Sequence, residues 1–566
     1  MLSADGTVAI IFNGEIYNYR ELRDELLRTR SVSFRGGSDT EVIIALYQAH
    51  GERVFEKLNG MFAIALYDAA RKKIVLARDR LGKKPLYYAL AGNTLVFGSE
   101  PKALLAHPQF KKKLSLSALD RYLQYEYVPT PHAIFEGMHK LEPATYAVWQ
   151  DGKLSKREFW RMSFSEHPVS FSEAKKTLDQ HLARSVGSRL ISDVPLGVFL
   201  SGGIDSSTVA YYAQKNSTQK IKTFSIGFTE SSFDESSFAR TVAQSLGTDH
   251  REHMLSAKDS LDLIPRVADL LDEPMADPSI LPTYLLSRFT REHVTVALGG
   301  DGGDEVFAGY PTFQAFKLAA AYNRLPAALK KTLIEPLVNL LPVSERNMSA
   351  GFLVRRFIAG SAAPQEYRNQ FWLGAFSAGD RKKLLSGTVL AALQNEKEFS
   401  DIDRYRAELA SKDPFHLLQY TYLRTYMMDE VLVKVDRASM YNSLEVRAPL
   451  LDYQLVDFAN GLPFSYKLHG WRTKYILKEL MRDKLPRDIV YRKKKGFGIP
   501  LTAWLRNELR PLLTDLLSPD RLKRQGLFNP LFVQELIKEH LDNRADRRKE
   551  LWTLLVFQMW YDRWAN

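Results

Sequence analysis

The stretch of sequence that decides the fold is residues 200–207, which read Leu-Ser-Gly-Gly-Ile-Asp-Ser-Ser. The stretch follows an almost wholly apolar run, Val194 to Leu200, which is typical of a strand buried on both faces of a parallel sheet. It leads into a helix that we expect to begin near Ser207. A buried strand, a glycine turn and a helix in this order predict one unit of an α/β domain, with its ligand at the carboxyl end of the strand.

Helical and strand-like segments alternate on both sides of this stretch. Before it, apolar residues recur every four positions from Ala174 to Leu190, and Ser172 is a candidate cap for that helix. After it, short apolar runs predict strands at Lys222 to Phe228 and at Val294 to Leu298. Because strands that alternate with helices place helices on both faces of a sheet, we expect an α/β domain with a doubly wound parallel sheet. Later residues read as mostly helical.

The composition of residues 200–207 suits the binding of phosphate. Adjacent glycines let backbone N–H groups approach an anion closely, and the N-terminus of the following helix adds free donors. Serine hydroxyls can donate to phosphate oxygens, and Asp205 can hold magnesium. The residues that we expect to contact ATP here are Leu200, Ser201, Gly202, Gly203, Asp205, Ser206 and Ser207. An ordinary serine–glycine turn is the alternative interpretation.

The same eight residues resemble the S-G-G-x-D-S-S loop of the ATP pyrophosphatases, which cleave ATP between the α and β phosphates. They do not match the G-x-x-x-x-G-K-[ST] loop of kinases and GTPases. The resemblance implies that ATP is a substrate of this domain.

A second group of glycines and acids follows the third predicted strand. Residues 299–305 read Gly-Gly-Asp-Gly-Gly-Asp-Glu, so that backbone and carboxylates can crowd a nucleotide at this strand end as well. We expect Gly299 and Gly300 to lie against ATP. We expect Asp304 to be a second magnesium ligand that faces Asp205. The alternative is an acidic turn exposed to solvent.

The first hundred or so residues have a different pattern. Short apolar runs separated by turns, such as Val8 to Phe12 and Phe62 to Tyr67, predict strands, and one helical stretch runs from Asp39 to Tyr47. This pattern suits a layered α+β domain that is rich in antiparallel sheet. The parts that we expect are an α+β domain at residues 1–110, a connecting segment with a few strands at 111–170, and the α/β domain with its helical C-terminal part at 171–566.

Composition and charge narrow the class of protein. The 566 residues contain no cysteine, which excludes disulfides, thiolate zinc sites and a cysteine nucleophile within this chain. No apolar run approaches the roughly 18 residues that a membrane span needs, and no signal peptide is visible, so we expect a cytoplasmic protein without a membrane partner. A net charge of +12 is compatible with an RNA partner, but the basic residues are spread along the chain, so we expect no nucleic acid partner.

Three longer motifs separate this chain from other ATP pyrophosphatases, such as the GMP, NAD and argininosuccinate synthetases and tRNA-modifying enzymes. Residues 299–310 read GGDGGDEVFAGY, residues 435–452 read VDRASMYNSLEVRAPLLD, and residues 491–500 read YRKKKGFGIP. Over most of residues 171–560, this combination resembles the synthetase domain of the glutamine-dependent asparagine synthetases.

This resemblance implies a reaction for the second domain. Such enzymes adenylylate the side-chain carboxylate of aspartate with ATP, release pyrophosphate, and let ammonia displace AMP from β-aspartyl-AMP. The resemblance places the adenine near Ile226 and magnesium on Asp205 and Asp304. Lys494 would neutralise charge on the reacting phosphorus, with its basic neighbours as a solvated face. Asp301, where many family members carry glutamate, would assist the attack of ammonia as a base or a positioning group; a turn-forming carboxylate is the alternative.

Residues 12–18, Phe-Asn-Gly-Glu-Ile-Tyr-Asn, resemble the glutaminase domain of the same family, an αββα sandwich of the N-terminal-nucleophile type. The resemblance assigns Asn13 and Gly14 to an oxyanion hole. It implies that Glu15 and Asp39 bind the amine of glutamine. Family members begin with a cysteine that attacks glutamine, and they carry a longer segment before this motif. We therefore expect this chain, whether it reflects an internal start or a short protein, to use free ammonia rather than to hydrolyse glutamine.

The acceptor carboxylate stays open at this point. Aspartate is the acceptor in the parent family, a sugar acid of a cell-surface polysaccharide is a second choice, and a catalytically silent descendant is a third. The segment around residues 272–279 is where we expect the acceptor to be selected. The expected partners are small molecules, namely ATP with Mg²⁺, aspartate, and ammonia or glutamine. Whether the chain forms a homodimer stays open.

Overall fold

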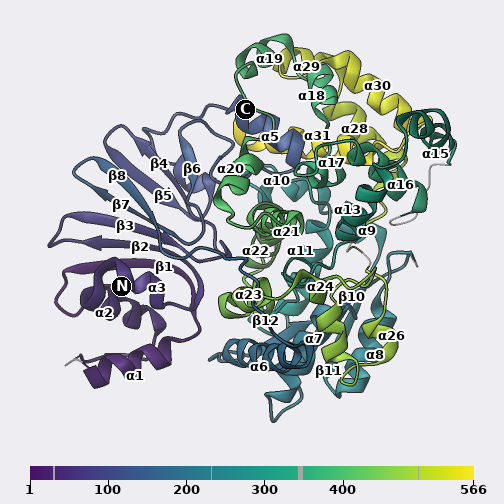
Figure 1. The fold of residues 1–566 in the computed structure, drawn as a ribbon. Helices are drawn as coiled ribbons and strands as arrows, with labels where there is room; N and C mark the ends of the chain where they lie inside the picture. The colour runs from purple at the N-terminus through teal and green to yellow at the C-terminus, as the bar shows by residue number, and fades with distance from the viewer. Residues whose placement is uncertain (30–31, 231, 342–348, 495, 497) are drawn as a thin grey trace.

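The computed structural model describes all 566 residues except 30–31, 231, 342–348, 495 and 497. Figure 1 shows a sheet-rich N-terminal part on one side and a larger, mostly helical part on the other, with both parts in contact along a broad boundary.

The N-terminal part stacks two antiparallel sheets between helices. The first sheet has the strand order β1-β2-β3-β7-β8, and the second has the order β5-β4-β6. Ile43 of a helix and Phe62 of the first sheet share one core, whereas Leu76 and Tyr88 join the two sheets through another. Leu104 lies against the far face of the second sheet. These layers are the αββα sandwich that the sequence predicts. The elements are β1 Val8–Ile16, α1 Tyr19–Thr29, α2 Asp39–His50, α3 Val54–Lys57, β2 Gly60–Asp68, β3 Lys73–Arg78, β4 Tyr87–Ala91, β5 Thr94–Gly98 and α4 Pro101–Leu105.

Residues 111–170, which the sequence suggests as a connecting segment, supply strands to both of these sheets. Strand β6 (Met138–Lys140) pairs with β4, and β7 (Thr145–Gln150) pairs with β3 and with β8 (Lys153–Glu158). The helix of this segment, α5 (Leu116–Tyr125), packs instead among helices from the C-terminal end of the chain. The segment therefore ties the two parts together by completing one and packing against the other.

The second part contains a five-stranded parallel sheet with the order β11-β10-β9-β12-β13. Helices α7 and α8 contact the sheet through one core and α11 through another, so that both faces are covered as in a doubly wound fold. The elements are α6 Phe171–Arg189, β9 Leu196–Phe199, α7 Ile204–Lys215, β10 Lys222–Phe228, α8 Ser236–Leu246, β11 Asp249–Leu255, α11 Ile280–Arg291, β12 Val296–Leu298, α12 Gly303–Val306 and β13 Glu445–Arg447.

Element boundaries differ from the sequence predictions by a few residues. Helix α6 is capped by the side chain of Ser170 rather than Ser172. Helix α7 begins at Ile204, three residues before the predicted start, because Gly203 already adopts the extended conformation of a cap. The earlier start moves Asp205, Ser206 and Ser207 from a loop into the first turn of the helix.

Buried charges hold the two parts together. The Arg189 guanidinium contacts the Asp452 carboxylate at 3.0 Å within the second part, and Asn59 of the first part donates to the same carboxylate at 3.0 Å. Lys84 of the first part pairs with Asp436 of the second at 2.9 Å. Because Arg189, Asp452 and Lys84 are almost fully buried, loss of one partner would leave an uncompensated charge in the interface.

Candidate functional site

The turn after β9 is organised by its own serines. The hydroxyls of Ser201 and Ser206 lie 3.1 Å apart, and the Ser201 hydroxyl accepts from the Gly203 N–H at 3.3 Å. The Ser207 side chain is fully buried, and its hydroxyl has no hydrogen-bond partner among the described residues. The contact between the hydroxyls of Ser201 and Ser206 therefore organises this strand end.

The turn after β12 lies directly against this loop. At Gly300, an added Cβ would lie 2.7 Å from the backbone nitrogen of Ser206, so that only glycine allows the two strand ends to approach this closely. At Gly303, an added Cβ would meet the carboxylate of Asp205 at 2.4 Å. The glycines of residues 299–303 therefore bring the second strand end onto the first.

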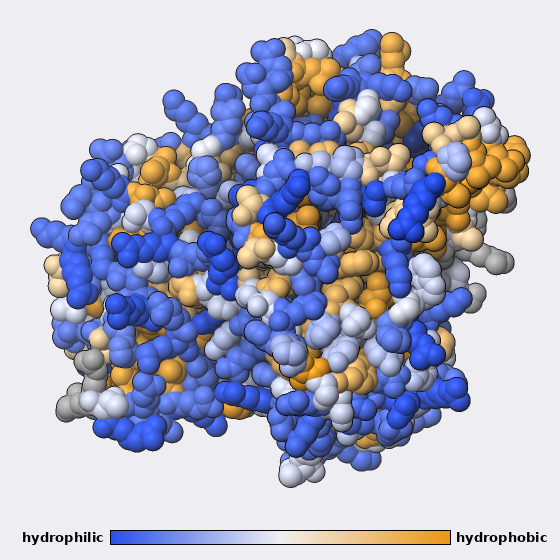
Figure 2. Space-filling model, in the orientation of Figure 1, coloured by the Kyte–Doolittle hydropathy of each residue, from blue (hydrophilic) through white to orange (hydrophobic). Residues whose placement is uncertain are grey.

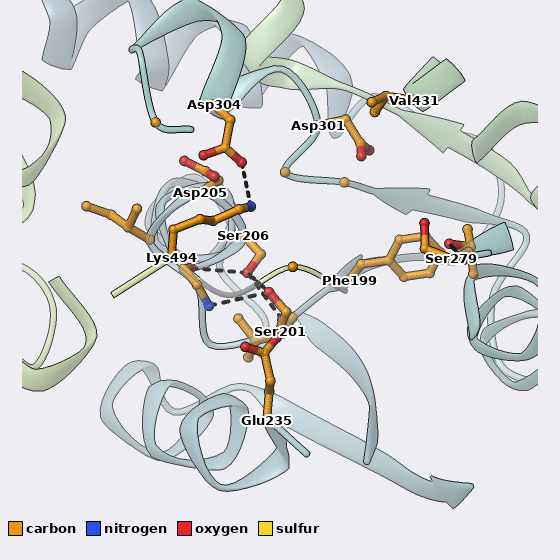
Figure 3. A pocket seen from close by; sticks show the side chains of 18 of the residues that line it. Phe199, Ser201, Asp205, Ser206, Glu235, Ser279, Asp301, Asp304, Val431 and Lys494 are labelled. Atoms are coloured by element: carbon orange, nitrogen blue, oxygen red, sulfur yellow. Dashed lines mark hydrogen bonds and ion pairs between the residues drawn. The ribbon is translucent and has the colours of Figure 1, made fainter. Parts of the chain in front are cut away.

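Two lysines contact the pair of carboxylates at this junction. The ammonium of Lys474 contacts Asp205 and also lies 2.5 Å from Asp304 Oδ1, which means that the two carboxylates are close neighbours. The ammonium of Lys494 lies 2.5 Å from Asp304 Oδ2 (Figure 3). The sequence paired Asp205 with Asp304 and selected Lys494, and the structure brings these three side chains together.

Electrostatics at the junction follow from burial and from these contacts. Burial raises the pKa of the Asp205 carboxyl. Burial acts in the same direction on Asp304, but the ammonium groups of Lys474 and Lys494 outweigh it and hold its pKa well below the usual range. Burial also disfavours the Lys494 ammonium, yet Asp304 and Asp205 raise the Lys494 pKa above its usual value. Lys494 therefore carries its positive charge at neutral pH.

A cleft of about 480 Å³ opens at these strand ends. Most of the residues that the sequence assigned to ATP and catalysis line it: Leu200, Ser201, Gly203, Asp205, Ser206, Ile226, Gly299, Gly300, Asp301, Asp304 and Lys494. Gly202 and Ser207 do not line it. Gly202 is buried against Phe238 of α8, and its carbonyl accepts from Arg492 at 3.4 Å.

Asp301 lies on the side of the cleft away from Lys494. Figure 3 shows the Asp301 carboxylate between the Asp304–Lys494 pair and Ser279. Lys434 stands on this side too, because its ammonium contacts Asp277 and the Ser279 hydroxyl, each at 2.9 Å. Burial raises the pKa of Asp301. The cleft thus has a phosphate side with serines and lysines and a second side with its own buried ion pair.

A much smaller cavity, of about 20 Å³, lies behind Asp301. Met61 and Lys83 of the N-terminal part line it together with Asp301 and Val446 of the second part. Asp301 and Val435 line both this cavity and the cleft.

Comparison with known proteins identifies the lineage of both parts. A family model for asparagine synthase matches residues 177–562, and one for a glutamine amidotransferase domain matches residues 1–160. Asparagine synthetase [glutamine-hydrolyzing] 1 of Bacillus subtilis is 32% identical over 98% of this chain and 86% of its own length. The chain belongs to the asparagine synthase family. Asparagine synthetase [glutamine-hydrolyzing] 3 of the same organism is 29% identical over 96% of this chain and 84% of its own length. Amidase chry2 of Gibberella zeae is 26% identical over 92% of this chain and 81% of its own length.

In this member of the asparagine synthase family, none of the residues that the sequence assigned to glutamine binding lines the ATP cleft. Asn13 donates its amide to the Ser99 hydroxyl at 3.1 Å. The Glu15 carboxylate lies 3.4 Å from Arg447 of β13, and burial raises the Glu15 pKa to about 7. Asp39 accepts from the backbone N–H of Ile16 at 3.0 Å.

Gly14 shows why this motif needs glycine. An added Cβ would lie 2.0 Å from the Met61 carbonyl of β2, and the Gly14 φ of +152° is rare for other residues. The motif Asn13 to Glu15 is therefore held in place by pairing of β1 with β2.

The carboxylate pair fits magnesium delivered with ATP. Asp205 Oδ1 is buried and has no hydrogen-bond partner in the part of the chain that the structure describes. Within those same residues, no group of three or more His, Asp and Glu side chains could hold a metal ion. Two carboxylates plus phosphate oxygens are the ligand set that magnesium prefers, so Asp205 and Asp304 would hold Mg²⁺ only together with the nucleotide.

Three lysines of the site were not found from the sequence. Lys474, Lys434 and Lys83 all lie outside the motifs that we interpreted. Lys474 meets Asp205 across 269 residues and Lys434 meets Asp277 across 157 residues. A lone lysine carries no local signal of such a partner.

Proposed function

We propose that this chain makes asparagine from aspartate, ATP and ammonia through β-aspartyl-AMP, with AMP and pyrophosphate as the other products. Family membership supports amide formation that uses ATP. The observation that carries the proposal is the contact between Lys494 and Asp304, 190 residues apart, in a cleft that the serine–glycine loop also lines. A cation, a carboxylate pair and a loop suited to binding phosphate in one cleft support this proposal.

ATP would lie with its phosphates over Ser201, Gly203 and Ser206 and its adenine near Ile226. The N-terminus of α7, which has no side-chain cap, would present backbone N–H donors to the phosphates. The magnesium held by Asp205 and Asp304 would supply positive charge to the departing pyrophosphate. Leu200, Gly299 and Gly300 complete the proposed ATP contacts.

The aspartate carboxylate would attack the α-phosphorus while Lys494 neutralises the charge that develops there. Lys494 is suited to this role because its raised pKa keeps it charged and its side chain is 37% exposed toward the cleft. Positioning and charge neutralisation supply most of the acceleration in phosphoryl-type transfers. Of the four basic residues 492–495, Arg492 instead bonds to Glu235, beside the loop.

Ammonia would then attack the acyl carbon on the Asp301 side of the cleft. A C–N bond forms, the C–O bond to AMP breaks, and the amine loses a proton. Burial raises the pKa of Asp301, which makes its carboxylate a stronger base than an exposed aspartate and suits it to accept or guide that proton. The small cavity shared by Asp301, Met61 and Lys83 supports arrival of ammonia from the N-terminal side.

We propose that the nitrogen source of this polypeptide is ammonium. Its 566 residues contain no cysteine to attack glutamine, although Asn13, Gly14, Glu15 and Asp39 match the residues with which the family binds glutamine.

The test is pyrophosphate release by the purified chain with ATP, Mg²⁺ and aspartate, with glutamine and ammonium compared as donors. Asparagine and pyrophosphate in equal amounts with ammonium alone would support the whole proposal. Turnover with glutamine would contradict the ammonium-only part. No turnover with aspartate under either donor would contradict the choice of acceptor and direct the search to another carboxylate, such as a sugar acid, or to a silent protein.

A further inference from the structure

A leucine-rich helix lies exposed on the second part of the molecule. The helical run α14 (Ala327–Leu329), η3 (Lys330–Ile334) and α15 (Glu335–Asn339) contains no buried side chain among the residues that the structure describes. Its leucines recur every four residues and therefore share one face. Leu333 is 51% exposed and Leu337 is 55% exposed, and Leu340, just after the helix, is 80% exposed.

The apolar surface extends onto a neighbouring helix. Helix α16 (Ala350–Ser361) packs against α15 and exposes Leu353. Figure 2 shows hydrophobic residues gathered at the upper right, where Figure 1 places α15. We call this surface the leucine patch, defined by Leu325, Leu329, Leu333, Leu337, Leu340 and Leu353. An amphipathic helix is normally stabilised by burial of its apolar face, and monomeric proteins rarely expose an apolar patch of this extent.

The charges around the leucine patch are almost all positive. Residues 311–341 contain two lysines and an arginine close to the helix, Lys330, Lys331 and Arg324, together with Lys317, and one acidic residue, Glu335. Arg324 and Lys331 are exposed. Leucines on one side and basic residues beside them are the pattern of helices that lie in the interface of a membrane.

We propose that the leucine patch docks on the surface of an anionic lipid bilayer. A second copy of the chain fits less well, because a two-fold contact would place two basic surfaces against each other. A protein partner would have to offer an apolar groove to receive a projecting helix, whereas a bilayer receives it by insertion between headgroups. None of the helices in the described part of the chain is both long enough and apolar enough to cross a bilayer, so the contact is peripheral.

The experiment is co-sedimentation of the whole chain with vesicles of phosphatidylcholine alone or of an equal mixture with phosphatidylglycerol, at roughly 0.1 M and 0.5 M NaCl. The test variant is Leu333→Gln with Leu337→Gln. The matched control is Leu27→Gln, because Leu27 is a leucine that is 50% exposed on helix α1 of the other part. Circular dichroism and the unfolding midpoint confirm that each variant folds, as expected for changes at exposed positions.

We expect the parent to bind the anionic vesicles, to release them in high salt, and to ignore the neutral ones. The double leucine variant should lose about tenfold in partition coefficient, and Leu27→Gln should behave as the parent. Amide synthesis without vesicles should be the same in all three proteins. Failure of the parent to bind, or equal binding by the double variant, would overturn the proposal. Self-association that the double variant abolishes, without vesicle binding, would overturn it in favour of a second copy.

Discussion

Replacing Gly300 with alanine tests whether the close approach of two strand ends builds the ATP site. The added Cβ would lie 2.7 Å from the Ser206 nitrogen and 3.1 Å from the Asp205 carbonyl carbon. Both are backbone atoms and cannot rotate out of the way. Because non-bonded heavy atoms prefer about 3.5 Å or more, the two turns would have to separate by roughly 0.8 Å.

This separation predicts a larger effect on catalysis than on folding. Overpacking by one methyl group typically costs about 1–3 kcal/mol of stability. A displacement approaching 1 Å between the phosphate loop and Asp304 should lower kcat/KM for ATP about 100-fold, which equals about 2.7 kcal/mol of barrier. Pyrophosphate release at varied ATP gives kcat/KM, and urea unfolding gives the stability.

The control for this experiment is Gly387→Ala on α19 (Gly387–Leu393). It adds the same methyl group at a position where, apart from its own helix turn, no heavy atom of the described residues lies within 4 Å of the added Cβ, so both stability and activity should stay near the parent values. If Gly300→Ala kept the parental kcat/KM for ATP, the two strand ends would not need their observed separation, and our account of the site would be wrong.

Three further changes test the chemistry and the interface. Lys494→Met should lower pyrophosphate release about 100-fold, whereas Lys493→Met should change it less than about threefold; the reverse order would contradict the choice of lysine. Asp301→Asn, which removes the proposed base, should leave ATP binding intact and slow asparagine formation at least about tenfold in single-turnover assays, and an unchanged rate would exclude that role. Asp452 is buried, and Arg189 and the other partners of Asp452 hold its pKa at about 2, below the ordinary 3.8. The ionised Asp452 carboxylate therefore stabilises the folded state above pH 4, and this contribution is lost as the pH falls toward 2. That shift in pKa corresponds to about 2 kcal/mol of stability. In urea unfolding, Asp452→Asn should lower the free energy of unfolding by about 3 kcal/mol at pH 7 and should make stability fall less steeply as the pH is lowered. An unaltered dependence of stability on pH would refute this role of Asp452.

Patterns confined to a few consecutive residues were predicted well from the sequence. Strand β10 occupies Lys222 to Phe228 as predicted, because an apolar run with β-branched and aromatic residues is a local signal. The serine–glycine loop and the 299–305 turn were also recognised locally, and parallel strands bring their ends to one edge. The proximity of Asp205 and Asp304 therefore follows from the sequence pattern alone.

Features that depend on distant partners were not predicted. The start of α7 at Ile204 was not predicted, because the sequence does not reveal that Gly203 adopts the extended conformation of a cap. Lys474 was missed because its role comes from carboxylates far away in the chain. The segment 111–170 was interpreted as a connection because strand pairing with β3 and β4 leaves no mark in its own sequence.

Asp301 lies between two cavities, and its neighbours fix the position of its carboxylate there. An added Cβ at Gly299 would lie 2.4 Å from Asp301 Oδ2, so that the observed position of the carboxylate depends on glycine at residue 299. In this position it faces the cleft on one side and the small cavity beside Met61 on the other. A base that accepts the proton must lie within hydrogen-bond reach of the ammonia nitrogen while that nitrogen attacks the acyl carbon. If ATP and aspartate fill the cleft, the small cavity offers ammonia an approach that would not displace them. The shorter reach of aspartate is then no handicap, because Asp301 already borders both cavities.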